Sequence, residues 1–185
     1  MNSKILGKIE FTRVNGGRSA YFEDSRLNKI KTDLIVGKQA IFSAMSHLFK
    51  DAGLYEETEG VHAAGLFTAK GNPVSMVEDI RRHNTLDKII GYAMLHKVDC
   101  GNAFLVSTGR MASEMVTKIY RCGIPIVATK TAVTDKGLEI GKKCGLTIIG
   151  FVRYIGTKIH TDMDVKIYKE AGMKIYCGAQ RILCE

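Results

Sequence analysis

Hydroxyl and cationic side chains follow three short apolar segments in the second half of the chain. They stand in residues 107–110 (Ser-Thr-Gly-Arg), 129–132 (Thr-Lys-Thr-Ala) and 150–153 (Gly-Phe-Val-Arg). Hydroxyls, cations and the free backbone N–H groups at a helix start are the groups that bind phosphate oxygens. The same residue types also serve as helix caps or surface cations, so one such segment alone would indicate little. Three successive segments predict an anionic ligand, with these candidate contacts: Thr108, Arg110, Lys130 and Thr131.

A second polar cluster occupies residues 78–88 (EDIRRHNTLDK). Asp79 and His83 lie four residues apart there, among further carboxylates and guanidiniums, and such a pair is able to act as an acid and a base. A lone histidine is more often a structural group. An enzyme that uses Asp79 and His83 is therefore one hypothesis that the sequence leaves open.

Several kinds of chemistry have no support in the sequence. The chain has five cysteines and no Cys-x-x-Cys, so neither a disulfide framework nor a zinc site is expected. Cys122 and Cys144 each precede a glycine and are expected to be small buried side chains. Zinc-dependent nucleobase deaminases need a glutamate two residues after the first ligand, but alanine follows His62 at that spacing. Dinucleotide-binding and Walker-type glycine motifs are absent as well.

The composition is that of a globular domain. The 185 residues are 45% hydrophobic and 25% charged, and we expect a single domain over residues 1–185. The formal net charge of +8 suits a phosphate-rich ligand, although a basic, solvated surface is the simple alternative. Nothing resembles a nucleic-acid recognition pattern, a membrane span or a signal peptide. We therefore expect a soluble, cytoplasmic protein that does not bind membranes, and nucleic acid is not an expected partner.

The periodicity of apolar residues predicts a mixed α/β fold. Hairpins are expected at 7–14 with 19–23 and at 61–69 with 74–79. Helices are expected at 38–50, 83–96, 111–121 and 134–143, and buried strands at 103–107, 124–128 and 146–150. Such alternation is typical of parallel strands covered on both faces, hence a three-layer α/β/α sandwich with a mixed sheet. Ligands of these folds bind beyond the carboxyl ends of the parallel strands, where the three polar segments should meet.

Several of these segments, in this order, resemble one protein family. They are residues 60–64 (GVHAA), 78–88, 107–110 and 144–153 (CGLTIIGFVR), with a weaker echo in 175–182. The segments are similar to those of the FdhD-type formate dehydrogenase accessory proteins, and the match covers about residues 35–153. The resemblance implies a cytidine-deaminase-like fold without zinc and a homodimer. It also implies sulfur transfer from a cysteine desulfurase to the molybdenum bis(molybdopterin guanine dinucleotide) cofactor of formate dehydrogenase.

The resemblance further implies where the cofactor, or a guanine nucleotide in its place, would bind. The family's binding stretch falls on Phe151, Val152, Arg153, Tyr154, Ile155 and Gly156. His62 and His83, which lie within the matching motifs, are expected to contribute as well. This location is at the carboxyl ends of the strands, where the polar segments had independently predicted an anionic ligand.

The chain departs from the family in ways that affect function. The sulfur-carrying Cys-x-x-Cys would fall on residues 33–36, where this chain has Asp33-Leu34-Ile35-Val36, and no persulfide forms on these side chains. Arg81 replaces a family glycine, the family's N-terminal portion is missing, and residues 154–171 are additional. The favoured hypothesis is a maturation factor that binds the cofactor without the sulfur relay. The alternative is a sulfurtransferase that uses another cysteine, with Cys177 as the candidate.

Overall fold

The computed structural model of this chain describes residues 10–14, 17–21, 27–154, 158–160, 165–167 and 171–183, with side chains in 27–154 and 171–183. Its helices are α1 (Lys38–Asp51), α2 (Gly53–Thr58), α3 (Arg82–Leu95), α4 (Ser113–Arg121) and α5 (Asp135–Cys144). Two short 3-10 turns are η1 (Cys100–Asn102) and η2 (Ala179–Arg181). The strands are β1 (Glu10–Val14), β2 (Gly17–Tyr21), β3 (Val36–Gly37), β4 (His62–Thr68), β5 (Pro73–Asp79), β6 (Ala103–Ser107), β7 (Ile126–Thr129), β8 (Thr147–Arg153), β9 (Lys158–His160), β10 (Val165–Ile167), β11 (Gly172–Cys177) and β12 (Ile182–Leu183).

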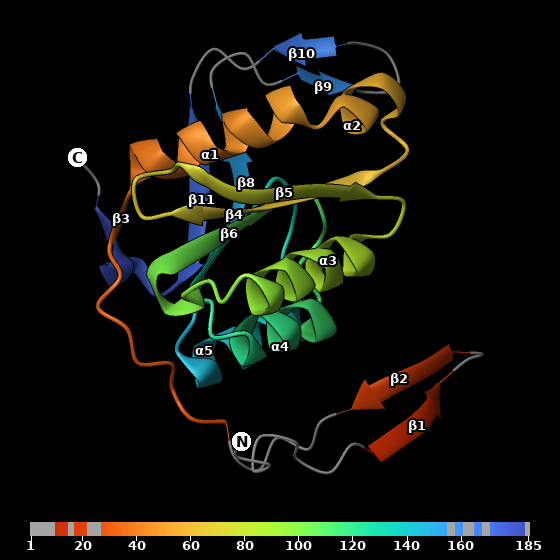
Figure 1. The fold of residues 1–185 in the computed structure, drawn as a ribbon, viewed down its shortest axis with the longest axis vertical. Helices are drawn as coiled ribbons and strands as arrows, with labels where there is room; N and C mark the ends of the chain where they lie inside the picture. Colours follow the sequence, from red (N-terminus) through yellow and green to blue (C-terminus); the bar gives the residue numbers. More distant parts are fainter. Residues whose placement is uncertain are drawn as a thin grey trace.

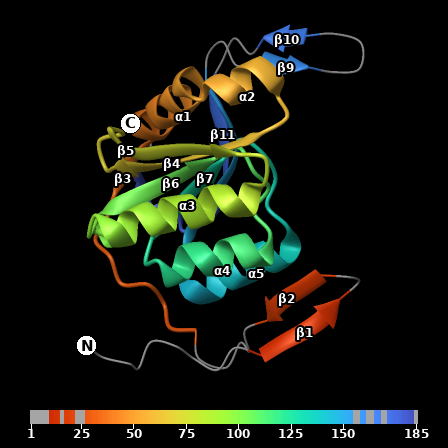
Figure 2. The same cartoon turned by 45° about the vertical axis from the view of Figure 1, so that its right-hand side comes forward.

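A six-stranded mixed sheet forms the centre of the molecule, in the order β11-β8-β7-β6-β4-β5. Strands β6, β7 and β8 are parallel, whereas β4, β5 and β11 pair antiparallel with their neighbours. Helices α1 and α2 lie over one face, and α3, α4 and α5 lie over the other (Figures 1 and 2). The expected three-layer α/β/α sandwich is confirmed.

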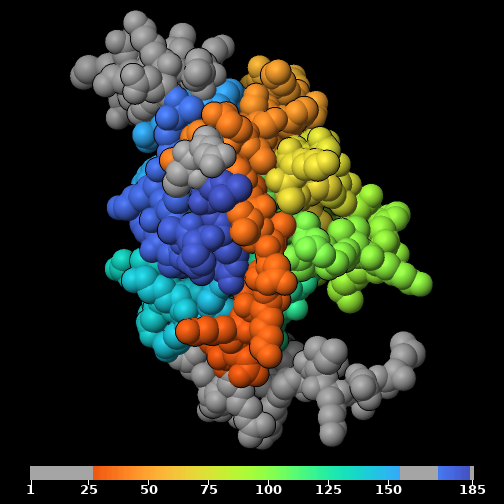
Figure 3. Space-filling model, turned by 90° about the vertical axis from the view of Figure 1, so that its left-hand side faces the viewer, coloured from red at the N-terminus to blue at the C-terminus, as the bar shows by residue number. Residues whose placement is uncertain are grey.

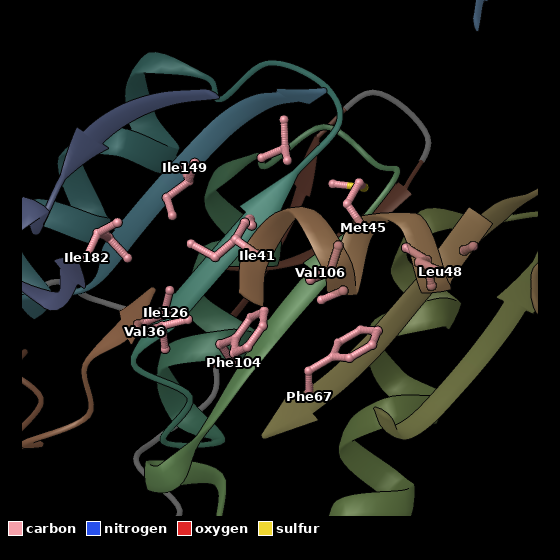
Figure 4. Close-up of a cluster of buried hydrophobic side chains, with 14 of the residues drawn as sticks. Val36, Ile41, Met45, Leu48, Phe67, Phe104, Val106, Ile126, Ile149 and Ile182 are labelled. Atoms are coloured by element: carbon pink, nitrogen blue, oxygen red, sulfur yellow. The ribbon is translucent and has the colours of Figure 1, made fainter. Parts of the chain in front are cut away.

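Each face of the sheet has its own hydrophobic core. On the α1 side, Ile41, Met45 and Leu48 of the helix pack toward Phe104 and Val106 of β6 (Figure 4). On the other side, Leu105 of β6 packs with the apolar residues of α3, α4 and α5. Alternate residues of β6 thus face different cores, which is why this strand is continuously apolar.

The sheet has two chemically different ends. At the end where β6, β7 and β8 finish, β4 begins and α3 starts; we call this end the carboxyl rim. The opposite end, which we call the amino end, carries η1 and the short β3–β12 pair, in which Val36 lies opposite Ile182. Figure 3 looks at this amino end, where the orange segment containing β3 runs between the blue C-terminal strands and the green end of α3.

Most expected elements are found within one to three residues of their predicted bounds. The first hairpin is confirmed in the β1–β2 pairing, with Val14 opposite Gly17. In the additional segment 154–171, β9 and β10 pair antiparallel. Among the helices that the structure describes, none combines the length and the apolar character needed to cross a bilayer.

Candidate functional site

The carboxyl rim brings together residues from three elements that are distant in sequence. The hydroxyl of Thr108, directly after β6, accepts a hydrogen bond from the Ala63 backbone N–H at 3.0 Å. It lies 3.4 Å from Nδ1 of His62, and the Thr108 N–H donates to the Ala63 carbonyl at 2.9 Å. The end of β6 is therefore fastened to the start of β4, with His62 and Thr108 side by side as the sequence predicted for one site.

Arg82, at the start of α3, completes this group and was not among the predicted contacts. Its side chain lies against Gly109: a Cβ added to Gly109 would stand 2.8 Å from the Arg82 Cβ. Nε of Arg82 is buried and has no hydrogen-bond partner among the described residues. A buried cationic donor without a partner is costly, so this atom indicates a ligand acceptor. The polar cluster 78–88 was the available signal, but its spacing favoured Asp79 and His83 instead.

Positive charge accumulates at this point of the rim. Burial, and then the charges of Arg82 and Arg110, lower the pKa of His62. Burial and the charge of Arg82 also lower the pKa of His83, with a smaller contribution from Lys118. Protonation of either histidine is disfavoured first by burial and then by the nearby cations, whose charge attracts an anion; at His83 the carboxylates of Glu114 and Asp87 act in the opposite direction.

The turns after β6 and β7 are held together by a hydroxyl network. The Thr129 hydroxyl donates to the Gly109 carbonyl at 2.7 Å and lies 3.2 Å from the Thr131 hydroxyl. The Ser107 hydroxyl accepts from the Gly109 N–H at 3.0 Å. Gly109, against which the Arg82 side chain lies, is thus held by hydrogen bonds on both its N–H and its carbonyl. The Thr131 hydroxyl belongs to this network.

The two helix starts that the sequence suggested as a phosphate cradle both carry acidic side chains. The Thr134 hydroxyl accepts from the Gly137 N–H at 3.2 Å and caps α5, whose first turn carries Asp135. The first turn of α4 carries Glu114. A carboxylate at these positions disfavours an anion, and at α5 the observed contact is the cap that the alternative interpretation expected.

Lys130 is directed away from the group around Arg82. Its Nζ donates to the Tyr55 hydroxyl at 2.9 Å and lies 4.7 Å from the centre of the Phe49 ring. Glu78 anchors this contact, because its Oε1 accepts from the Tyr55 N–H at 2.6 Å. Tyr154 packs beside Phe49, with the ring centres 5.9 Å apart. Lys130 and Tyr154 therefore belong to an aromatic cluster on the α1 side of the sheet.

Phe151 is the unusual residue of the predicted binding stretch. Its φ is +52°, a left-handed conformation that is strained for a bulky side chain, and 36% of its surface is exposed. The Arg153 guanidinium lies 5.9 Å from the centre of the Phe151 ring, and the Phe151 backbone N–H donates to the Thr131 carbonyl at 3.1 Å. Val152 is only 1% exposed and packs in the α1-side core, so its side chain is not placed for ligand contact. The other two predicted residues, Ile155 and Gly156, lie outside the described residues.

Asp79 and His83 do not form the acid–base pair that their spacing suggested. Asp79 accepts hydrogen bonds from the Arg81 N–H and the Asn84 side chain, both at 3.0 Å, and pairs with Lys88 at 2.7 Å. These contacts, that of Lys88 first, lower the pKa of Asp79 to about 2, which makes it a poor base. Asp79 fixes the start of α3. Arg81, where relatives are expected to have glycine, has an ordinary extended backbone with φ −109°.

Cys177 lies at the amino end of the sheet, away from the rim, where it is opposite Ile148 of β8. Its thiol donates to the Leu146 carbonyl at 3.3 Å, and burial raises its pKa. A thiol with a raised pKa is a weak nucleophile at neutral pH, which disfavours Cys177 as a sulfur acceptor. In the segment expected to carry the relay thiols, Asp33 is exposed and Val36 is wholly buried in β3.

Comparison with known proteins identifies similar chains. The profile of the FdhD/NarQ family matches residues 9–183. The sulfur carrier protein FdhD of Saccharolobus solfataricus is 36% identical over 143 residues, which are 77% of this chain and 55% of that protein. The protein of the same name from Bacillus pumilus is 35% identical over 147 residues, 78% of this chain and 56% of that one. The chain thus spans about half the length of the curated relatives that it matches.

A solved structure extends the similarity to the fold. A Desulfotalea psychrophila protein, assigned as a formate dehydrogenase accessory protein, superposes with a TM-score of 0.70 at 26% sequence identity. The superposition covers 94% of this chain and 69% of that one. The resemblance read from the sequence motifs is therefore confirmed.

Proposed function

Since this chain belongs to the FdhD/NarQ family, we propose that it is an accessory factor for formate dehydrogenase maturation that binds the molybdenum bis(molybdopterin guanine dinucleotide) cofactor, or a guanine nucleotide, at its carboxyl rim. The cofactor is cargo in this proposal. A cysteine desulfurase as sulfur donor, formate dehydrogenase as recipient and a homodimeric assembly belong to the same proposal.

The observation that carries the proposal is the buried, unpartnered Nε of Arg82 beside Gly109. A phosphate oxygen is a strong acceptor for such a donor, and an arginine–phosphate contact is charge-assisted. His62 lies beside the Thr108 hydroxyl, and the charges of Arg82 and Arg110 add to burial in lowering its pKa, which supports a shared electrostatic environment for these side chains. We assign the diphosphate to this group.

The guanine base has a separate candidate position at Phe151. Its half-exposed ring lies beside the Arg153 guanidinium, and nucleobases stack on aromatic rings and on arginine planes. Strands β6 and β8 lie two positions apart in the sheet, which is about 9.6 Å at a strand spacing of about 4.8 Å. An extended nucleoside diphosphate is able to bridge that separation.

The test is thermal denaturation of the intact chain with GDP. A ligand at a hundred times its Kd stabilises a protein by about 2.7 kcal/mol, which for this size raises Tm by about 5–11 °C. Arg82→Gln keeps much of the side-chain volume and removes the charge, so the rise should fall to less than half. Lys142→Gln, an equal charge change on the exposed last turn of α5, should leave the rise intact. The proposal is wrong if GDP and the purified cofactor both leave Tm unchanged.

A further inference from the structure

Two cysteines that are distant in sequence meet at the amino end of the sheet. Cys100 lies in η1, just before β6, and Cys122 is the C-cap of α4. Their sulfur atoms are 3.4 Å apart, within hydrogen-bonding distance. Both side chains are partly exposed, so reagents have access to them.

The pair lies in the wall of a hollow of about 750 Å³ between α3, η1 and α4. Lys97, Lys118 and Arg121 supply cations to its lining, and Asp87 and Asp99 supply carboxylates. Both carboxylates have partners: Asp87 binds Lys118 at 2.6 Å, and Asp99 accepts from the Gly101 N–H at 3.1 Å and from the Asn102 side chain. The lining therefore carries charges of both signs, and the Asp99 carboxylate, like burial, opposes a thiolate on Cys100.

The two thiols have different properties. The hydrogen bond from Cys122 lowers the pKa of Cys100, whereas that contact and burial raise the pKa of Cys122. Cys122 also stands at the C-terminal end of α4, where the helix dipole disfavours a negative charge, so we take Cys122 as the donor of this contact and Cys100 as its acceptor. A thiolate is the reactive form of cysteine, so Cys100 is the nucleophile of the pair and Cys122 is its positioning residue.

We propose that Cys100, positioned by Cys122 at this hollow, accepts a sulfane sulfur atom from a persulfide. The proposal rests on the family assignment for its sulfur chemistry, because relatives are named sulfur carrier proteins. It does not require the rim ligand. It gives this chain a sulfur-accepting position although residues 33–36 contain no thiol.

The reaction is a displacement at sulfur. The Cys100 thiolate attacks the outer sulfur of a donor persulfide, R–S–SH, and forms a new S–S bond. The S–S bond of the donor breaks, and R–S⁻ leaves with the electron pair. The product is Cys100–S–SH, in which the transferred sulfur keeps its proton and its oxidation state. No oxidant or reductant is consumed.

The first test maps the added sulfur on the intact, reduced chain. The protein is treated with glutathione persulfide, blocked with iodoacetamide, digested and analysed by mass spectrometry. One additional sulfur atom on Cys100 is expected; its appearance on Cys177 or Cys184 with none on Cys100 would overturn the proposal. Cys100→Ser should abolish the adduct and Cys177→Ser should keep it. Because the wild-type map alone decides the position, a poorly folded variant does not weaken the test.

The second test addresses Cys122. Cys122→Ala removes the hydrogen-bond donor, so the pH profile for alkylation of Cys100 should move to higher pH, with about tenfold slower reaction near neutral pH for each pKa unit gained. Cys122→Ser keeps a donor and should restore most of the rate. Identical profiles for all three proteins would refute the positioning role. Failure of GDP to raise Tm would contradict only the rim proposal, so the two proposals fail separately.

Discussion

Replacing Gly109 by alanine tests the contact that orients Arg82. The new Cβ would stand 2.8 Å from the Arg82 Cβ and 3.3 Å from its Cδ. Gly109 has little freedom to retreat, because its N–H donates to the Ser107 hydroxyl at 3.0 Å and its carbonyl accepts from Thr129 at 2.7 Å. Since the position of the Arg82 Cβ is set by its backbone, the start of α3 must shift and carry the Arg82 side chain with it.

The expected cost has two parts. Inserting a methyl group into a packed site costs about 1–3 kcal/mol of unfolding free energy. Displacing the Arg82 guanidinium removes a hydrogen bond between charged groups in the complex, worth about 1.5–3 kcal/mol. The second part corresponds to an increase of about ten- to a hundredfold in the Kd for GDP.

Urea denaturation with and without GDP measures both parts on the same samples. Gly91→Ala is the matched control, because a Cβ at that position of α3 meets no atom within 4 Å. Alanine in a helix interior should raise stability by about 0.5–1 kcal/mol, and GDP binding should not change. If Gly109→Ala proves as stable as the wild type and binds GDP equally well, the reasoning about Arg82 is wrong.

Three further outcomes follow from individual side chains. Asp79→Asn should destabilise the chain near neutral pH, because it removes the ion pair with Lys88. Folding lowers the Asp79 pKa from 3.8 to about 2, so this stabilisation exists above about pH 3.8 and disappears as pH falls toward 2. The urea midpoints of the two proteins should therefore converge near pH 2. For His62, whose pKa is lowered in the free protein, a bound phosphate favours the protonated ring. GDP affinity measured by titration calorimetry should therefore rise as the solution becomes more acidic, and His62→Gln should weaken that dependence. Lys130→Met should lower the unfolding free energy by about 1–2 kcal/mol, because the contacts with Tyr55 and Phe49 are lost, and GDP should still bind. If the variant no longer binds GDP, Lys130 belongs to the ligand site.

The elements were predictable because their signals are local. Strand β6 was predicted at residues 103–107 and is observed there, since a short apolar run before a polar turn has few other solutions. The order of the polar turns then placed Thr108 and Arg110 at the rim. The family resemblance alone suggested His62, and the antiparallel pairing of β4 with β6, which brings it to the rim, was not predicted.

Other parts of the site depend on contacts that no spacing encodes. Lys130 meets Tyr55, which is 75 residues away in sequence, and this contact removed it from the predicted cradle. Cys100 and Cys122 come together because η1 and the end of α4 lie at the same end of the sheet. Arg82 was overlooked because its importance lies in one buried nitrogen beside Gly109, a property of packing and not of residue type.

Strand β6 joins the two proposed sites, with Cys100 before its first residue and Thr108 after its last. Five residues at about 3.3 Å each separate them by about 17 Å. On one polypeptide, a sulfur atom attached to Cys100 therefore lies a full strand length from the residues proposed to hold the diphosphate. Transfer from one copy to cargo held by another copy, or to the receiving enzyme, avoids that separation.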